Sequence, residues 1–156
     1  VLMALDAEVK LRSVHGERTV LLEHLFTGYR KTSLAPSEVI VEIVCRVPAK
    51  GARARWRKVG TRSAQSIAKV ALASVVEIDK GTIMRARFGA ASLAAVTHAL
   101  PATRTLVEGK KVAGLVRADV EAALAKDVTP IDDVRSTGAY RMHVAKALVW
   151  QALADG

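Results

Sequence analysis

The chain has 156 residues, 51% of them hydrophobic, and a mean hydropathy of +0.21, which leaves enough apolar material for one average domain or two small ones. Its 24 Lys and Arg against 15 Asp and Glu give a net charge of +9. No apolar run approaches the ~18–20 residues of a membrane span, and the first residues lack the features of a signal peptide. The single cysteine excludes an internal disulfide and favours a cytoplasmic protein.

The first 48 residues have the alternation of β-strands. Residues 8–12 alternate between apolar and polar side chains, and residues 18–22 can form the second arm of a hairpin. Residues 38–47 alternate over a longer stretch that is bounded by prolines on both sides. Because Cys45 falls on an apolar face of this stretch, we expect it to be a buried, reduced thiol.

Three further strands follow a short linker, at residues 53–59, 68–78 and 82–88. Asp79-Lys80-Gly81 is a favourable tight turn between the last two, since Gly81 can adopt a positive φ. The spacing predicts an antiparallel meander.

Helical spacing replaces the alternation after about residue 100. Pro101 suits the first turn of a helix to about residue 108, and a second helix is predicted near 115–126. The last helix carries an apolar stripe that starts at Tyr140, with Ser136 as the expected N-cap. Strands followed by segregated helices predict an α+β fold.

The positive charge is concentrated in one segment. No acidic residue lies between Glu42 and Glu77, whereas eight Lys and Arg do. Such a segment favours phosphates, nucleic acid or an acidic protein face as partners, and it also fits a solvated surface. Aromatic residues make up only 4% of the chain, which counts against a nucleic-acid-binding module because single-strand binders stack bases on aromatic rings.

The familiar catalytic and phosphate-binding motifs are absent from the sequence. It has no glycine-rich phosphate loop, and its four histidines lie too far apart to form a zinc site of ordinary spacing. Asp132 and Asp133 are adjacent, so they do not share a face, and a capping role is expected for them. The residues alone describe a basic α+β protein without catalytic machinery of its own.

Three ordered motifs resemble a known family. Residues 26–40, FTGYRKTSLAPSEVI, resemble the F-x-G-Y-R-K-T-x-L-x-P-x-E-x-I run near the end of the FAD-binding domain of xanthine dehydrogenases. Residues 57–70 resemble the segment that opens the C-terminal domain of the same flavoproteins, including that of carbon monoxide dehydrogenase. Residues 129–136, followed by Tyr140-Arg141, are similar to the terminal D-D-x-R-x-S-x-x-Y-R motif.

The resemblance implies a fold, a set of cofactors and a set of partners. It implies an incomplete end of an FAD-binding domain over residues 1–48, then an α+β domain over 53–156 with a β-meander packed against C-terminal helices. In this family electrons pass from a molybdopterin through 2Fe–2S clusters to FAD, and then to NAD or another acceptor. The implied partners are the iron–sulfur and molybdopterin portions and the upstream FAD-binding part that holds the pyrophosphate. The chain alone would not turn over substrate.

The resemblance also nominates residues near the flavin. Lys58 falls on the family's flavin-contacting lysine, and Ile40 falls where the family packs a hydrophobic residue near the ring. Lys31 and Glu38 belong to the same motif as Ile40, and Lys31 is expected near the flavin or the nucleotide acceptor. No metal ligand and no catalytic residue is nominated.

One question stays open in this interpretation, and one structural role is predicted for the terminal motif. The reducing substrate is expected to be a purine, with an aldehyde, carbon monoxide or an aromatic acyl-CoA as alternatives. In the terminal motif, Arg135 and Arg141 are expected to bridge to Asp132 or Asp133 and anchor the last helix on the sheet.

Overall fold

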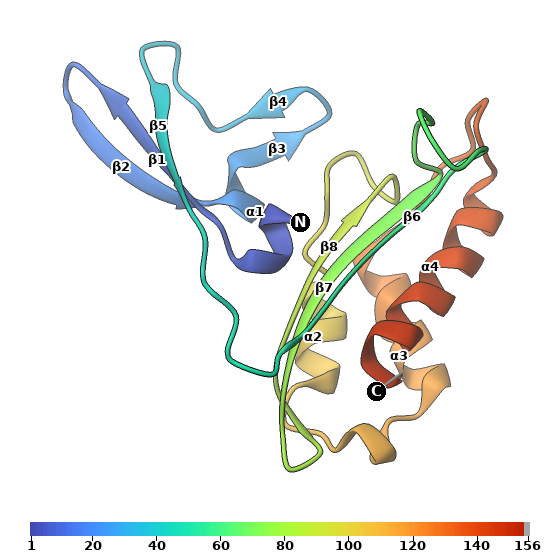
Figure 1. Ribbon diagram of the computed structural model, residues 1–156. Helices are drawn as coiled ribbons and strands as arrows, with labels where there is room; N and C mark the ends of the chain where they lie inside the picture. Colours follow the sequence, from blue (N-terminus) through green and yellow to red (C-terminus); the bar gives the residue numbers. More distant parts are fainter. Residues whose placement is uncertain (155–156) are drawn as a thin grey trace.

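The computed structural model describes residues 1–154, which form two connected parts (Figure 1). Residues 1–48, the N-terminal part, carry a three-stranded sheet of order β2-β1-β5 and a small β3-β4 hairpin. Residues 53–154, the C-terminal part, carry a sheet of order β6-β7-β8 with three α-helices. Antiparallel sheets with segregated helices confirm the predicted α+β class.

The N-terminal part begins with a short helical turn and continues mainly as strands. Its elements are η1 (Leu2–Leu5), β1 (Glu8–Ser13), β2 (Gly16–Leu21), α1 (Leu22–Leu25), β3 (Phe26–Gly28), β4 (Lys31–Thr32) and β5 (Val39–Val44). Strand β1 is central and pairs antiparallel with both β2 and β5. The predicted strands are therefore present, although β5 ends at Val44 rather than at residue 47.

The core of this sheet is small. Val9, Leu11 and Leu25 are its buried residues, whereas every residue of β5 is exposed. Cys45, which directly follows β5, is also exposed, so the expectation of a buried thiol is wrong. Alternation predicts burial only where another layer covers one face of the strand, and the described residues place no layer over β5.

The C-terminal part is a meander followed by helices. Its elements are β6 (Arg53–Val59), β7 (Val70–Asp79), β8 (Thr82–Ala91), α2 (Pro101–Val107), η2 (Val112–Gly114), α3 (Arg117–Asp127) and α4 (Gly138–Ala154). The β7–β8 hairpin closes through Lys80 and Gly81, whose φ angles of 47° and 80° are both positive. That pattern is typical of the hairpin turn that the sequence predicted.

The helices cover one face of the β6-β7-β8 sheet and close the main core (Figure 1). Phe88, Ile83 and Val76 of the sheet are fully buried there together with Leu124 and Leu153 of α3 and α4. This core is what holds the opposite face of the sheet in a fixed position.

Three details of the helices differ from the predictions. Val116 precedes α3 and is 56% exposed, although the helix was predicted to begin near residue 115. The buried face of α4 includes Gly138, Arg141 and Ala145 but not Tyr140, so the predicted stripe is displaced by one residue. The cap is Thr137 rather than Ser136, because Thr137 Oγ1 accepts a hydrogen bond of 3.2 Å from the Tyr140 N–H.

Among residues 1–154, no helix is long and apolar enough to cross a membrane.

Candidate functional site

The face of the β6-β7-β8 sheet that lies away from the helices carries an ordered set of residues. Opposed residues in a sheet share a face, so the register places Lys58, Ala71 and Ala91 in one row. Trp56 heads the neighbouring row, opposite Ala73, and Gly89 completes that row. A further row ends at Arg87. We call this side of the sheet the open face.

Helical turn η1 covers part of the open face. Ala4 packs against Ala73, and a Cβ added to Gly89 would lie 3.0 Å from Met3 Cβ, which explains the small residues at both positions. Helical turn η1 leaves the row of Lys58, Ala71 and Ala91 partly open, and Ala71 and Ala91 are half-buried.

Lys58 and Trp56 stand at the exposed edge of the open face. Both belong to β6, two residues apart, and therefore project to the same side. Trp56 is 58% exposed and Lys58 is also exposed. Together with the half-buried alanines they provide a cation, an aromatic ring and a flat apolar floor. This combination suits a planar aromatic group that gains negative charge.

Lys31 lies in the N-terminal part, on the β3-β4 hairpin. With Arg30 and the rest of the hairpin it lines a cavity of about 400 Å³, whose opposite wall is residues 95–97 of the loop after β8. Two cations on the cavity wall favour an anionic occupant. The structure therefore puts Lys31 at a junction of the two parts, on a site separate from the Lys58 row.

Glu38 links the segment before β5 to β2. Its carboxylate accepts hydrogen bonds from Arg18 Nε and Nη2 at 2.6 and 2.8 Å and from the Ala35 N–H at 2.7 Å. The Arg18 guanidinium, with the backbone donor, lowers the Glu38 pKa from 4.5 to about 2. Ile40, two residues on, is 49% exposed in β5, opposite Leu11.

The four nominated residues thus lie on different strands and loops. In the described part of the chain, no hydrogen bond or ion pair joins any two of them. Lys58 and Ile40 are exposed on open surfaces, Lys31 is exposed on the wall of its cavity, and Glu38 is half-buried. No group of His, Cys, Asp and Glu within residues 1–154 could hold a metal ion.

The terminal motif anchors the last helix. Asp132 Oδ1 accepts a hydrogen bond of 2.5 Å from the Gly138 N–H at the start of α4, which is the expected capping role. Asp133 lies 2.7 Å from Arg135 Nη2 and 2.5 Å from Arg141 Nη2. The two arginines lower the Asp133 pKa, Arg135 most strongly. Buried Arg141 also donates to the Ser92 carbonyl after β8 at 2.9 Å, which confirms the predicted anchoring of the helix on the sheet.

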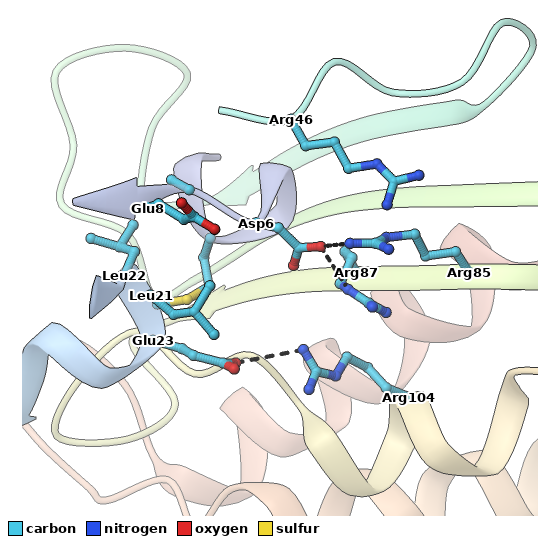
Figure 2. A pocket seen from close by; sticks show the side chains of 11 residues that line it. Asp6, Glu8, Leu21, Leu22, Glu23, Arg46, Arg85, Arg87 and Arg104 are labelled. Carbon is cyan, nitrogen blue, oxygen red and sulfur yellow. Dashed lines mark hydrogen bonds and ion pairs between the residues drawn. The ribbon is translucent and has the colours of Figure 1, made fainter. Parts of the chain in front are cut away.

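Sequence reasoning missed a cluster of charges between the two parts (Figure 2). Asp6, which follows η1, accepts hydrogen bonds from both Arg85 and Arg87 of β8. Arg104 of α2 lies 3.5 Å from Glu23 of α1. The available signal was the i, i+2 spacing of Arg85 and Arg87, which puts both arginines on one side of a strand.

The comparisons with known proteins match both parts. Residues 55–155 match the family model described as CO dehydrogenase flavoprotein C-terminal domain. Residues 1–50 match the model described as FAD binding domain in molybdopterin dehydrogenase.

Two curated relatives extend this result. The chain is 30% identical, over 99% of its length and 52% of the relative's, to 6-hydroxypseudooxynicotine dehydrogenase complex subunit alpha of Paenarthrobacter nicotinovorans. It is 40% identical to xanthine dehydrogenase/oxidase of Mus musculus, over 53% of this chain and 6% of that protein.

Solved structures share the fold. Carbon monoxide dehydrogenase of Hydrogenophaga pseudoflava superposes with a TM-score of 0.87 at 24% identity, over 97% of this chain and 53% of that one. Reconstituted CO dehydrogenase of Oligotropha carboxidovorans gives 0.87 at 21% identity, over 96% and 52%. The chain thus spans about half the length of the first curated relative and of these structures. With the motifs, these matches show that the chain belongs to the CO dehydrogenase flavoprotein family, within the molybdenum hydroxylases of the xanthine dehydrogenase type.

Proposed function

We propose that the chain is the C-terminal part of the FAD subunit or domain of a molybdenum hydroxylase. In this proposal it belongs to a cytoplasmic oxidoreductase in which electrons pass from 2Fe–2S clusters through FAD to NAD or another acceptor. Molybdopterin and the clusters belong to partner domains or subunits. The family match supports the proposal, as do relatives whose names describe a dehydrogenase complex subunit and a xanthine dehydrogenase.

The position of Lys58 carries the proposal. FAD accepts and donates electrons, and its reduced isoalloxazine ring carries additional negative charge. A fixed ammonium group beside the ring stabilises that charge. Lys58 stands on the open face next to Trp56 and above half-buried alanines, so this side of the sheet can hold a flat ring with a cation at its edge.

The exposed apolar residues of β5 support a shared flavin site. Val39, Ile40 and Ile43 are 60%, 49% and 47% exposed, and β5 is an edge strand with free backbone groups. Exposed apolar edge strands invite pairing. We infer that further polypeptide, which carries the phosphate-binding loops, covers β5 and brings the flavin close to Ile40.

Replacement of Lys58 in the complete, FAD-loaded enzyme tests this assignment. We expect Lys58→Met to lower the two-electron reduction potential of bound FAD by on the order of 30 mV, which corresponds to ~1.4 kcal/mol. Lys50→Met, in the exposed linker before β6, is the matched control. An unchanged potential together with unchanged FAD content in Lys58→Met would exclude this lysine from the flavin site.

The reducing substrate belongs to the molybdenum portion. A purine is our first expectation, and an aldehyde, carbon monoxide or an aromatic acyl-CoA are the alternatives. Turnover assays of the complete enzyme with one substrate of each class distinguish them.

Nucleic-acid binding is the alternative function from another class. Arginines of the basic segment that contact other groups of this protein argue against it. Arg53 and Arg55 donate to carbonyl groups at the C-terminal end of α4. The helix dipole also stabilises positive charge at this end. Arg46 lies 3.6 Å from Glu77. A steep loss of binding to DNA or RNA with rising salt would support that alternative.

A further inference from the structure

A second cavity, distinct from the Lys58 face and from the Lys31 cavity, lies where the two parts meet (Figure 2). Its volume is about 420 Å³, within the size range of small-molecule sites. One side is apolar and comes from the N-terminal part, with Leu21, Leu22 and Met3. Four guanidinium groups and three carboxylates also line the cavity, which leaves one positive charge in excess; they belong to Arg46, Arg85, Arg87, Arg104, Asp6, Glu8 and Glu23.

Many donors of these arginines have no partner within residues 1–154. Arg85 and Arg87 share the Asp6 carboxylate, and Arg87 also donates to Glu108. Arg104 forms an ion pair of 3.5 Å with Glu23 and makes no side-chain hydrogen bond within the described residues. Yet the side chains of Arg85, Arg87 and Arg104 are only 26%, 19% and 22% exposed. Half-buried guanidinium groups with unused donors require water or an anion to satisfy them.

The charge around these groups favours an anion. Burial lowers the Arg85 pKa and so does the positive charge of Arg87, whereas Glu108 opposes the shift and Arg104 adds to it. Like charges held this close repel, because the cavity wall screens them less than bulk water does. An oxyanion between them relieves the repulsion and accepts their donors in the bidentate geometry that guanidinium groups prefer.

We propose that this cavity binds a small organic anion with a phosphate or carboxylate head and an apolar body. The head contacts Arg104, Arg85 and Arg87 from the C-terminal part. The body lies on Leu21 and Leu22 from the N-terminal part. A ligand there bridges the two parts and competes with Asp6 for the arginines.

Calorimetric titration of the complete native enzyme tests the proposal with three probes. Phenyl phosphate and benzoate supply the two heads on the same apolar ring, and inorganic phosphate supplies a head alone. We expect saturable binding of at least one aromatic probe, with phenyl phosphate tighter than inorganic phosphate because the ring covers the leucines. Equal affinity for the two phosphates contradicts the apolar side of the site. Absence of saturable binding, including through occupation of the cavity by other polypeptide, overturns the proposal.

Two substitutions with opposite expected effects make the site assignment specific. Arg104→Gln removes donors and is expected to weaken binding on the order of tenfold. Asp6→Asn removes the competing carboxylate and is expected to strengthen binding by a similar factor, a gain that misfolding cannot produce. Arg117→Gln, on the exposed surface of α3 where Arg117 pairs with Glu121, is the control and leaves binding unchanged. Unchanged affinity in both Arg104→Gln and Asp6→Asn overturns the assignment.

Discussion

Both three-stranded sheets of the molecule are antiparallel, yet their surroundings differ. The β6-β7-β8 sheet is sealed on one face by helices, and 17 buried residues form a single cluster there. The β2-β1-β5 sheet has three buried residues in its cluster, and its strand β5 is exposed throughout. The first sheet is stabilised by packing. The second depends on polar contacts between strands and on the charges that join the two parts.

Substitution of matched phenylalanines gives the largest expected difference between the two parts. Phe88 of β8 is 0% exposed and Phe26 of β3 is 41% exposed. Phe88→Ala removes a buried ring and is expected to lower the free energy of unfolding by about 3–5 kcal/mol. Phe26→Ala is expected to lower it by less than about 1 kcal/mol. Urea unfolding of the two variants measures both values, and equal losses would contradict the contrast in packing.

The anchor of α4 provides a test of intermediate size. Asp133→Asn leaves Arg141, which is 4% exposed, without its counterion. Removal of one partner of a fully buried ion pair is strongly destabilising, and because Asp133 is 22% exposed we expect a smaller loss of stability than for such a pair.

Arg135→Gln is the matched control for this test. Arg135 also pairs with Asp133, but its side chain is 43% exposed, so its loss is expected to cost about 0–1 kcal/mol. Thermal unfolding of both variants makes the comparison. A loss as large for Arg135→Gln as for Asp133→Asn would show that the ion pair with Arg141 does not anchor the helix.

Local patterns in the sequence predicted most of the C-terminal part because the packing there agrees with them. The Lys80-Gly81 turn and the start of α2 at Pro101 follow from turn chemistry and proline geometry. The displaced stripe of α4 has a physical cause. A long polar residue, Arg141, takes a core position, where Asp133 is its counterion and the Ser92 carbonyl accepts a hydrogen bond from its Nη1.

The N-terminal part was harder to predict because its contacts are long-range. Cys45 and the apolar residues of β5 have the alternation of a covered strand, but burial depends on which other segment packs on them. The charges of Asp6 and Arg85 become a site only when η1 docks on the open face, and no local pattern encodes that contact. Lys58 could be nominated only through the resemblance to the family.

The smallest expected effect concerns the ion pair between Arg18 of β2 and Glu38 of the segment before β5. Glu38 has a pKa of about 2 in the fold, against an ordinary value of 4.5, because Arg18 and the Ala35 N–H stabilise its charge. A depressed carboxylate pKa contributes stability above about pH 4.5, and this contribution is lost as the pH falls toward 2. The stability difference between the protein and its Glu38→Gln variant should therefore be full at neutral pH and vanish near pH 2.

Urea unfolding across this range measures the difference. A difference that is independent of pH would mean that Glu38 acts through its shape and not its charge, and the N-terminal part would then resemble the packed part more closely than its burial suggests.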